Sequence, residues 1–69
     1  MVNTNALRAE WIKKGLTQNQ VAKSIGISSK TMGNRMKNRV FGTDEAEKLI
    51  LLLDIENPAA IFFANRVTL

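Results

Sequence analysis

The chain has 69 residues, of which 45% are hydrophobic and 23% charged, so it has room for one small domain around a single core. It contains no cysteine and no histidine, which excludes disulfide bonds, thiol nucleophiles and the usual structural zinc sites, and removes the commonest general base. We therefore expect that the protein is not an enzyme and has no catalytic residue, no metal site and no cofactor.

Ten basic residues outnumber six acidic ones, which gives a net charge of +4 and an isoelectric point near 10.0. Eight of the ten basic residues, but only one of the six carboxylates (Glu10), precede Asp44. Because no carboxylate lies between Ile12 and Thr43, nothing local neutralises the cations of that stretch. We expect a continuous positive surface that suits an anionic partner such as nucleic acid; an ordinary solvated face is the alternative.

Residues 1–69 are predicted to form one domain, since the four glycines and the single proline fall singly and mark no repeat or linker. The start of the chain, Met1–Asn5, is polar and lacks the pattern of a secretion signal. The longest apolar run, Leu49–Leu53, is too short to cross a bilayer. We therefore expect a cytoplasmic protein with no membrane partner.

The first two predicted helices span Thr4–Lys14 and Gln18–Ile25. Lysines in the last turn of the first helix, and Gly15 directly after it, favour a helix end at that point. Thr17 is a favourable N-cap for the second helix, and Gly26 can take the left-handed conformation that ends it.

The third predicted helix spans Ser29–Lys37, with Ser28 as its N-cap. Met32 and Met36 are one helical turn apart and define its buried side, while the opposite side is polar, basic and small. Gly33 interrupts this helix at a cost of roughly 1 kcal/mol relative to alanine. We interpret Gly33 as a point of close approach, either to DNA or to the preceding helix.

Thr43 is the predicted N-cap of a fourth helix, Asp44–Leu53, whose acidic first turn suits the positive end of a helix. An Asn-Pro pair predicts a fifth short helix over Pro58–Phe63. Residues 64–69 are a predicted extended tail, in which polar and apolar residues alternate enough for a strand. The fold class is therefore all-α, a compact bundle of about five short helices. Its predicted core consists of Leu7, Trp11, Leu16, Val21, Ala22, Ile25, Ile27, Met32, Met36, Leu49, Ile50, Leu53, Ile55 and Phe62.

Residues Leu16–Met32 are predicted to form a helix, a tight turn opened by Gly26, and a second helix. A short side chain such as Ala22 is needed where two helices cross steeply, and it falls in the first of the two. The segments that match a known class are Gly15-Leu16-Thr17-Gln18, Val21-Ala22, Ile25-Gly26-Ile27-Ser28 and Thr31-Met32, with weaker matches at Leu7-Arg8 and Ile61-Phe62-Phe63. In these residues the chain resembles the Cro and repressor class of helix-turn-helix regulators from temperate phages and bacteria.

The resemblance implies a lambda-repressor-like DNA-binding domain that acts as a sequence-specific transcriptional regulator, of the phage Cro-like repressor kind, in the cytoplasm of a bacterial host. Its third helix would lie in the major groove of operator DNA. The residues implied to read bases are Ser29, Lys30, Gly33 and Asn34. Of these, Asn34 can pair with adenine and Lys30 can donate to guanine.

Phosphate contacts are expected from residues that flank the groove. They are Gln18, Lys14, Thr17, Ser28, Thr31, Arg35, Lys37, Asn38 and Arg39. Gln18 begins a helix whose positive end favours a phosphate, and the resembled class uses this glutamine in that way. Thr17 and Ser28 can serve as helix caps instead. Lys23 is a weaker candidate, because it lies on the exposed side of its helix.

The segment after the third helix departs from the resembled class. Members of the class often carry Asn-Gly at this place, whereas this chain has Lys37-Asn38-Arg39. Asn38 is therefore expected to supply the left-handed residue of the turn.

The sequence allows two kinds of partner, DNA or another protein. Double-stranded operator DNA is the first, with a homodimer that binds two half-sites; the apolar tail at 61–69 would form the dimer contact or else complete the domain's own core. The alternative function is an anti-repressor or modulator that binds another repressor protein, favoured by the same tail and by the small side chains of Ser29 and Gly33. A membrane-surface peptide is disfavoured, because the cations are spread over several capped helices.

Overall fold

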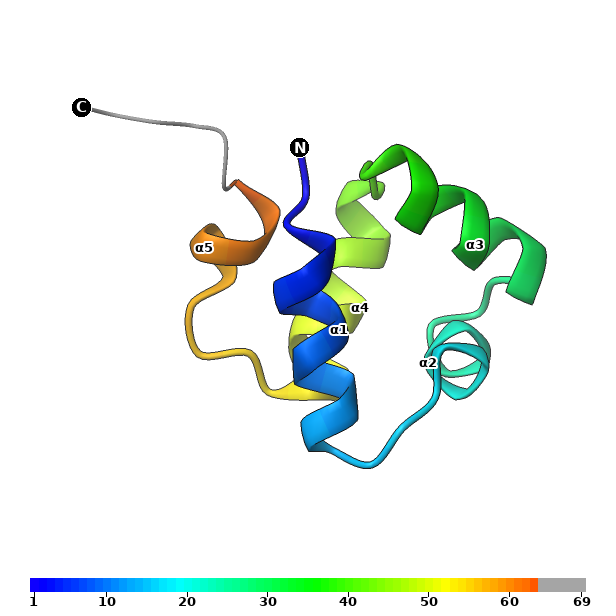
Figure 1. The fold of residues 1–69 in the computed structure, drawn as a ribbon, viewed down its shortest axis with the longest axis horizontal. Coiled ribbons are helices and arrows are strands. Elements are labelled where there is room, and N and C mark those ends of the chain that lie inside the picture. Colours follow the sequence, from blue (N-terminus) through cyan, green and yellow to red (C-terminus); the bar gives the residue numbers. More distant parts are fainter. Residues whose placement is uncertain (64–69) are drawn as a thin grey trace.

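The computed structural model describes residues 1–63, which form five helices and no strand (Figure 1). The helices are α1 (Thr4–Lys13), α2 (Gln18–Ser24), α3 (Ser29–Asn38), α4 (Thr43–Leu53) and α5 (Pro58–Phe62). The predicted all-α class is confirmed, and each predicted helix boundary lies within one residue of the observed one. The strand suggested for the tail falls on residues 64–69, outside the described residues.

α1 and α4 lie in the middle of the molecule, with α5 on one side and the α2–α3 pair on the other (Figure 1). α2 contacts both α1 and α3, and α5 contacts α1. α3 therefore lies at an edge of the molecule, far from α5, and leaves one of its faces uncovered. Across residues 1–63 no helix combines the length and the apolar character that a bilayer crossing needs.

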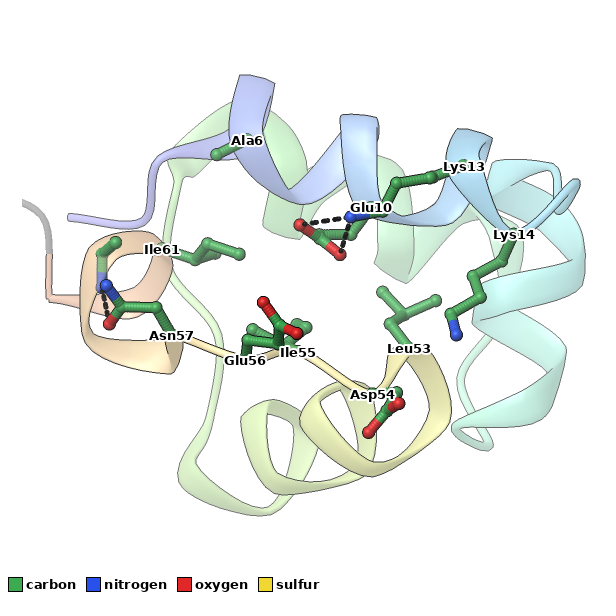
Figure 2. A pocket seen from close by; sticks show the side chains of 11 residues that line it. Ala6, Glu10, Lys13, Lys14, Leu53, Asp54, Ile55, Glu56, Asn57 and Ile61 are labelled. Atoms are coloured by element: carbon green, nitrogen blue, oxygen red, sulfur yellow. Dashed lines mark hydrogen bonds and ion pairs between the residues drawn. The ribbon is translucent and has the colours of Figure 1, made fainter.

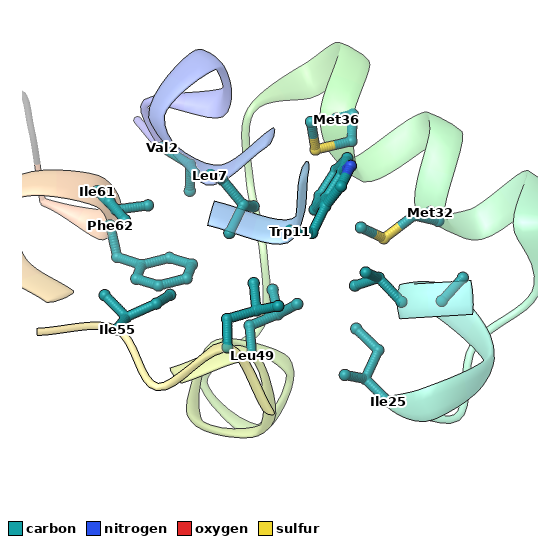
Figure 3. Packing of buried hydrophobic residues seen from close by; sticks show 13 residues of the cluster. Val2, Leu7, Trp11, Ile25, Met32, Met36, Leu49, Ile55, Ile61 and Phe62 are labelled. Atoms are coloured by element: carbon teal, nitrogen blue, oxygen red, sulfur yellow. The ribbon is translucent and has the colours of Figure 1, made fainter. Parts of the chain in front are cut away.

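The core is a single apolar cluster that connects all five helices. Figure 3 shows Trp11 of α1 beside Met36 and Met32 of α3, so the two methionines attach α3 to the centre of the bundle. All fourteen predicted core residues are buried or partly buried. Two core residues were missed, Val2 and Ile61, which are 6% and 4% exposed.

Ile61 and Phe62 complete the domain's own core, where Phe62 packs edge-on against Phe41 with ring centroids 6.4 Å apart. The apolar tail was expected either to form a dimer contact or to complete the domain's own core, and the second role holds for these two side chains. The segment before α1 joins the same region, since the N–H of Val2 donates to the carbonyl of Arg39 at 2.9 Å and that of Asn3 to the carbonyl of Ile61 at 2.7 Å.

The turns around α2 have the predicted chemistry. Gly15 and Gly26 both adopt positive φ, +75° and +83°, a region that side chains with a Cβ rarely occupy. Ala22 is 1% exposed, so a larger side chain at this position would push α2 away from its neighbours. The short turn and the small residue together fix the position of α3 relative to α2.

The turn after α3 differs from the prediction for Asn38. Asn38 is the last residue of α3, and Arg39 is the left-handed residue, with φ 59° and ψ 38°. The reason is that the carbonyl of Arg35 accepts from the N–H of Arg39 and also from that of Val40, at 3.3 Å, which closes the helix one residue later than expected. This reversal directs Phe41 back toward the core.

The N-cap of α4 is Gly42 rather than Thr43, which is already the first helical residue. The N–H of Gly42 donates to Oε1 of Glu45 at 2.9 Å, and its carbonyl accepts the first helical bond, from Ala46. The prediction for Thr43 was wrong because the N–H of Ala46, which a capping hydroxyl of Thr43 would have accepted, already donates to the carbonyl of Gly42, so the helix begins one residue earlier.

Candidate nucleic-acid interface

The N-terminus of α2 is held by a reciprocal pair of hydrogen bonds. The N–H of Gln20 donates to Oγ1 of Thr17 at 3.2 Å, and the N–H of Thr17 donates to Oε1 of Gln20 at 2.8 Å. Thr17 was predicted as a phosphate contact or as a helix cap, and the structure confirms the cap. Gln18 is half-buried at the first position of α2, and within residues 1–63 its side chain makes no hydrogen bond, so its amide is free for a ligand.

The two sides of α3 have opposite character. Met32 is fully buried and Met36 is 7% exposed, whereas Lys30, Asn34 and Lys37 are exposed. These three polar side chains have neither a hydrogen bond nor an ion pair with any other residue of the described chain. The structure therefore brings the two principal base-reading candidates, Lys30 and Asn34, together, one helical turn apart on the outward face of α3. The free cation of Lys37 lies one further turn along the same face.

The first turn of α3 is built by Ser28. Its Oγ accepts from the N–H of Thr31 at 3.0 Å and donates to Oγ1 of Thr31, also at 3.0 Å. The Ser28 hydroxyl is consequently occupied as a cap, while Thr31 still has its own hydroxyl hydrogen to donate. Both residues start α3 in a defined orientation.

Gly33 is open on its own side of α3. A Cβ built at Gly33 would meet no atom within 4 Å, so α2 does not approach this position. The interpretation of Gly33 as a close contact to the preceding helix was wrong. Because Gly33 has no side chain and precedes Asn34, it leaves room next to that amide for an external group.

A shallow depression of about 370 Å³ separates α2 from the start of α3. Ser29 lies at its edge, together with Asn19 and Lys23 of α2. Asn19 was not singled out from the sequence, and Lys23 was only a weak candidate. Their spacing of four residues was the available signal, because it places both on one face of α2.

Arg35 does not present a free cation. Its Nε donates to Oε1 of Glu45 at 2.8 Å and a terminal nitrogen donates to Oε2 at 3.1 Å, a two-bond pair that joins α3 to α4. The Glu45 side chain is 16% exposed and that of Arg35 40%. The expectation that nothing neutralises the cations between Ile12 and Thr43 is therefore wrong at Arg35, whose counter-ion comes from the next helix, and at Lys13, which pairs with Glu10.

The pair shifts the pKa of both groups. The hydrogen bond from Arg35 lowers the pKa of Glu45 below its ordinary value, against the opposing effect of burial, and the Gly42 N–H and the charges of Arg35 and Lys48 lower it further. The hydrogen bond to Glu45 raises the pKa of Arg35. The pair is therefore charged at neutral pH.

A carboxyl whose pKa is lower in the folded than in the unfolded state stabilises the fold above its unfolded pKa. That contribution is lost as the pH falls through the folded-state pKa. We expect Glu45→Gln to reduce the free energy of unfolding at neutral pH, and the difference from the wild type to disappear in acid. Urea unfolding of both proteins across this range measures it; a difference that stays constant with pH would contradict the role given to the ionised pair.

Lys14 lies apart from the outward face of α3. It lines a pocket of about 420 Å³ between α1, the end of α4 and α5, where it shares the walls with Glu10, Asp54 and Glu56 (Figure 2). Glu10 in turn pairs with Lys13 at 3.3 Å. The structure therefore groups this predicted phosphate contact with carboxylates instead of with the cations of α3.

Four exposed cations remain on or beside α2 and α3 without a carboxylate partner among residues 1–63: Lys23, Lys30, Lys37 and Arg39. Asn38, also exposed, lies between the last two. Apart from Glu10, every carboxylate of the chain lies in α4 or after it. The candidate interface is thus the outward face of α3 with its flanks, and it is positive. Across residues 1–63 no three metal-ligating side chains gather into a group.

Comparison of the chain with protein-family models, with curated proteins and with solved structures finds no match.

Proposed function

We propose that this protein is a sequence-specific DNA-binding transcriptional regulator, of the Cro-like repressor kind, which places α3 in the major groove of operator DNA. The observation that carries the proposal is the free outward face of α3, where Lys30, Asn34 and Lys37 have donors and acceptors without an intramolecular partner among residues 1–63. An α-helix with its side chains is about 10 to 12 Å across, which a major groove about 12 Å wide admits, and the ten residues of α3 extend about 15 Å along it.

The residues divide into readers and positioners. Asn34 would make the paired donor and acceptor contact with adenine, and Lys30 would donate to the acceptors of guanine. Ser29 and Gly33 adjoin them on α3. Gln18, Lys37 and the remaining flanking groups would bind phosphates, which supplies affinity without base preference. The further members of this flanking set are Lys23, Thr31, Asn38 and Arg39.

Contacts with the core and with α4 hold the readers in place. Met32 and Met36 attach α3 to the core, Ala22 lets α2 lie close, and the pair between Arg35 and Glu45 fixes α3 to α4. A helix held on several sides loses little freedom when it binds, so its few polar contacts can discriminate between bases.

Selection of bound sequences from random duplex DNA, at a stated salt concentration, tests this function. We expect enrichment of one motif, and an inverted repeat with half-sites about one helical turn apart if two copies bind together. Retention of all sequences alike would contradict base reading by α3. No retention of DNA, together with capture of a repressor protein, would instead favour the modulator function, whose support is weakened because Ile61 and Phe62 are buried.

A further inference from the structure

The pair between Arg35 and Glu45 has a consequence for the charge that α3 offers to a ligand. Arg35 belongs to α3 and lies next to Asn34 in the chain, yet its guanidinium makes two hydrogen bonds to the Glu45 carboxylate of α4. Oε1 of Glu45 also accepts from the N–H of Gly42 at 2.9 Å. The carboxylate is therefore fixed in position before any ligand arrives.

Arg35 is placed where it could otherwise reach a phosphate. It follows Thr31 by four residues, so the two lie on the same flank of α3, beside the outward face that carries Lys30 and Asn34. Its side chain remains 40% exposed even within the pair. A guanidinium forms two parallel bonds to a phosphate as readily as to a carboxylate, so the two anions compete for the same donors.

We propose that Glu45 masks Arg35 and so lowers by one the number of phosphates that the domain neutralises on DNA. This inference rests on the proposed function. The pair is only partly buried, so it adds modestly to stability, whereas removal of one cation from a DNA-binding face has a direct effect on affinity and on its salt dependence. Base readers then provide a larger share of the total binding, because part of the sequence-independent attraction is withheld.

The salt dependence of DNA binding measures the number of neutralised phosphates. We expect Glu45→Gln to free Arg35, which makes the slope of log affinity against log salt steeper by about 0.9 for one added contact. The ratio of affinities between 50 and 200 mM salt would then grow by about 3.5-fold. The uncharged amide of glutamine holds the guanidinium much less strongly than the carboxylate does, while its oxygen can still accept the Gly42 N–H at the start of α4.

Three variants isolate the pair from a general loss of negative charge. Glu47→Gln removes an exposed carboxylate from the same helix without touching Arg35, and should leave the slope near that of the wild type. Arg35→Gln alone should also leave it unchanged, because the masked guanidinium makes no phosphate contact. In the double variant Arg35→Gln with Glu45→Gln, the slope should return to that of the wild type, because no guanidinium remains to be freed. A purely structural role for the pair would not produce this pattern.

If Arg35→Gln makes the slope of log affinity against log salt shallower by about 0.9, the inference is overturned, since Arg35 would then bind phosphate despite Glu45. An unchanged slope in Glu45→Gln, or an increase that persists in the double variant, would overturn it as well. All three outcomes leave DNA binding by the wild type intact, so they are distinct from a failure of the proposed function. If the wild type binds no duplex at low salt, the function and the inference fall together.

Discussion

Met32→Ala is expected to lower the free energy of unfolding by about 2 to 5 kcal/mol, the range for removal of a buried methionine side chain. Met32 is fully buried and lies beside Trp11, so the change leaves a cavity at the point where α3 joins the core (Figure 3). A domain of 69 residues has only about 3 to 10 kcal/mol of stability in total. Urea unfolding measures the loss, which is a large fraction of that total.

Asn34→Ala is the matched control for that variant, because it removes a side chain two positions along the same helix, on the exposed side. Its unfolding free energy should stay within about 0.5 kcal/mol of the wild type, or rise, since alanine favours helix. A comparable loss of stability in both variants would contradict the assignment of the two sides of α3.

Asn34→Ala should have its large effect on DNA instead. We expect it to reduce discrimination at one base pair by about 1 to 3 kcal/mol, because the paired contact to adenine is lost, while the other positions of the site keep their preference. Competition binding with a set of single-substitution duplexes measures this. The control is Lys37→Ala, which should weaken all sequences alike and lower the salt slope by about one. Equal losses on every sequence from Asn34→Ala would remove this residue from the readers.

The helices could be predicted from the sequence because their signals are local. Thr17 and Ser28 cap α2 and α3, and Gly15 and Gly26 take positive φ where the pattern required it. Helical spacing of apolar residues also identified most of the core. The exposed position of Lys30 and Asn34 followed from the same spacing, since the face opposite the methionines must point outward.

The features that could not be predicted depend on contacts between distant parts of the chain. Arg35 and Glu45 are ten residues apart on different helices, so no spacing rule pairs them. The burial of Val2 depends on where α3 ends, because its N–H bonds to the carbonyl of Arg39. Arg39 takes the left-handed conformation although the neighbouring Asn38 is the better residue for it, because the N–H groups of Arg39 and Val40 both donate to the carbonyl of Arg35.

We propose that the outward face of α3 is the surface that meets duplex DNA. The most direct measurement is a nuclear magnetic resonance titration of isotopically labelled protein with a B-form duplex at low ionic strength. We predict that shifts concentrate on the amides of Lys30 to Asn38 and on the first turn of α2, while those of α4 beyond Glu45 change little. No shift at all, or shifts centred on α4 and α5, would contradict the account.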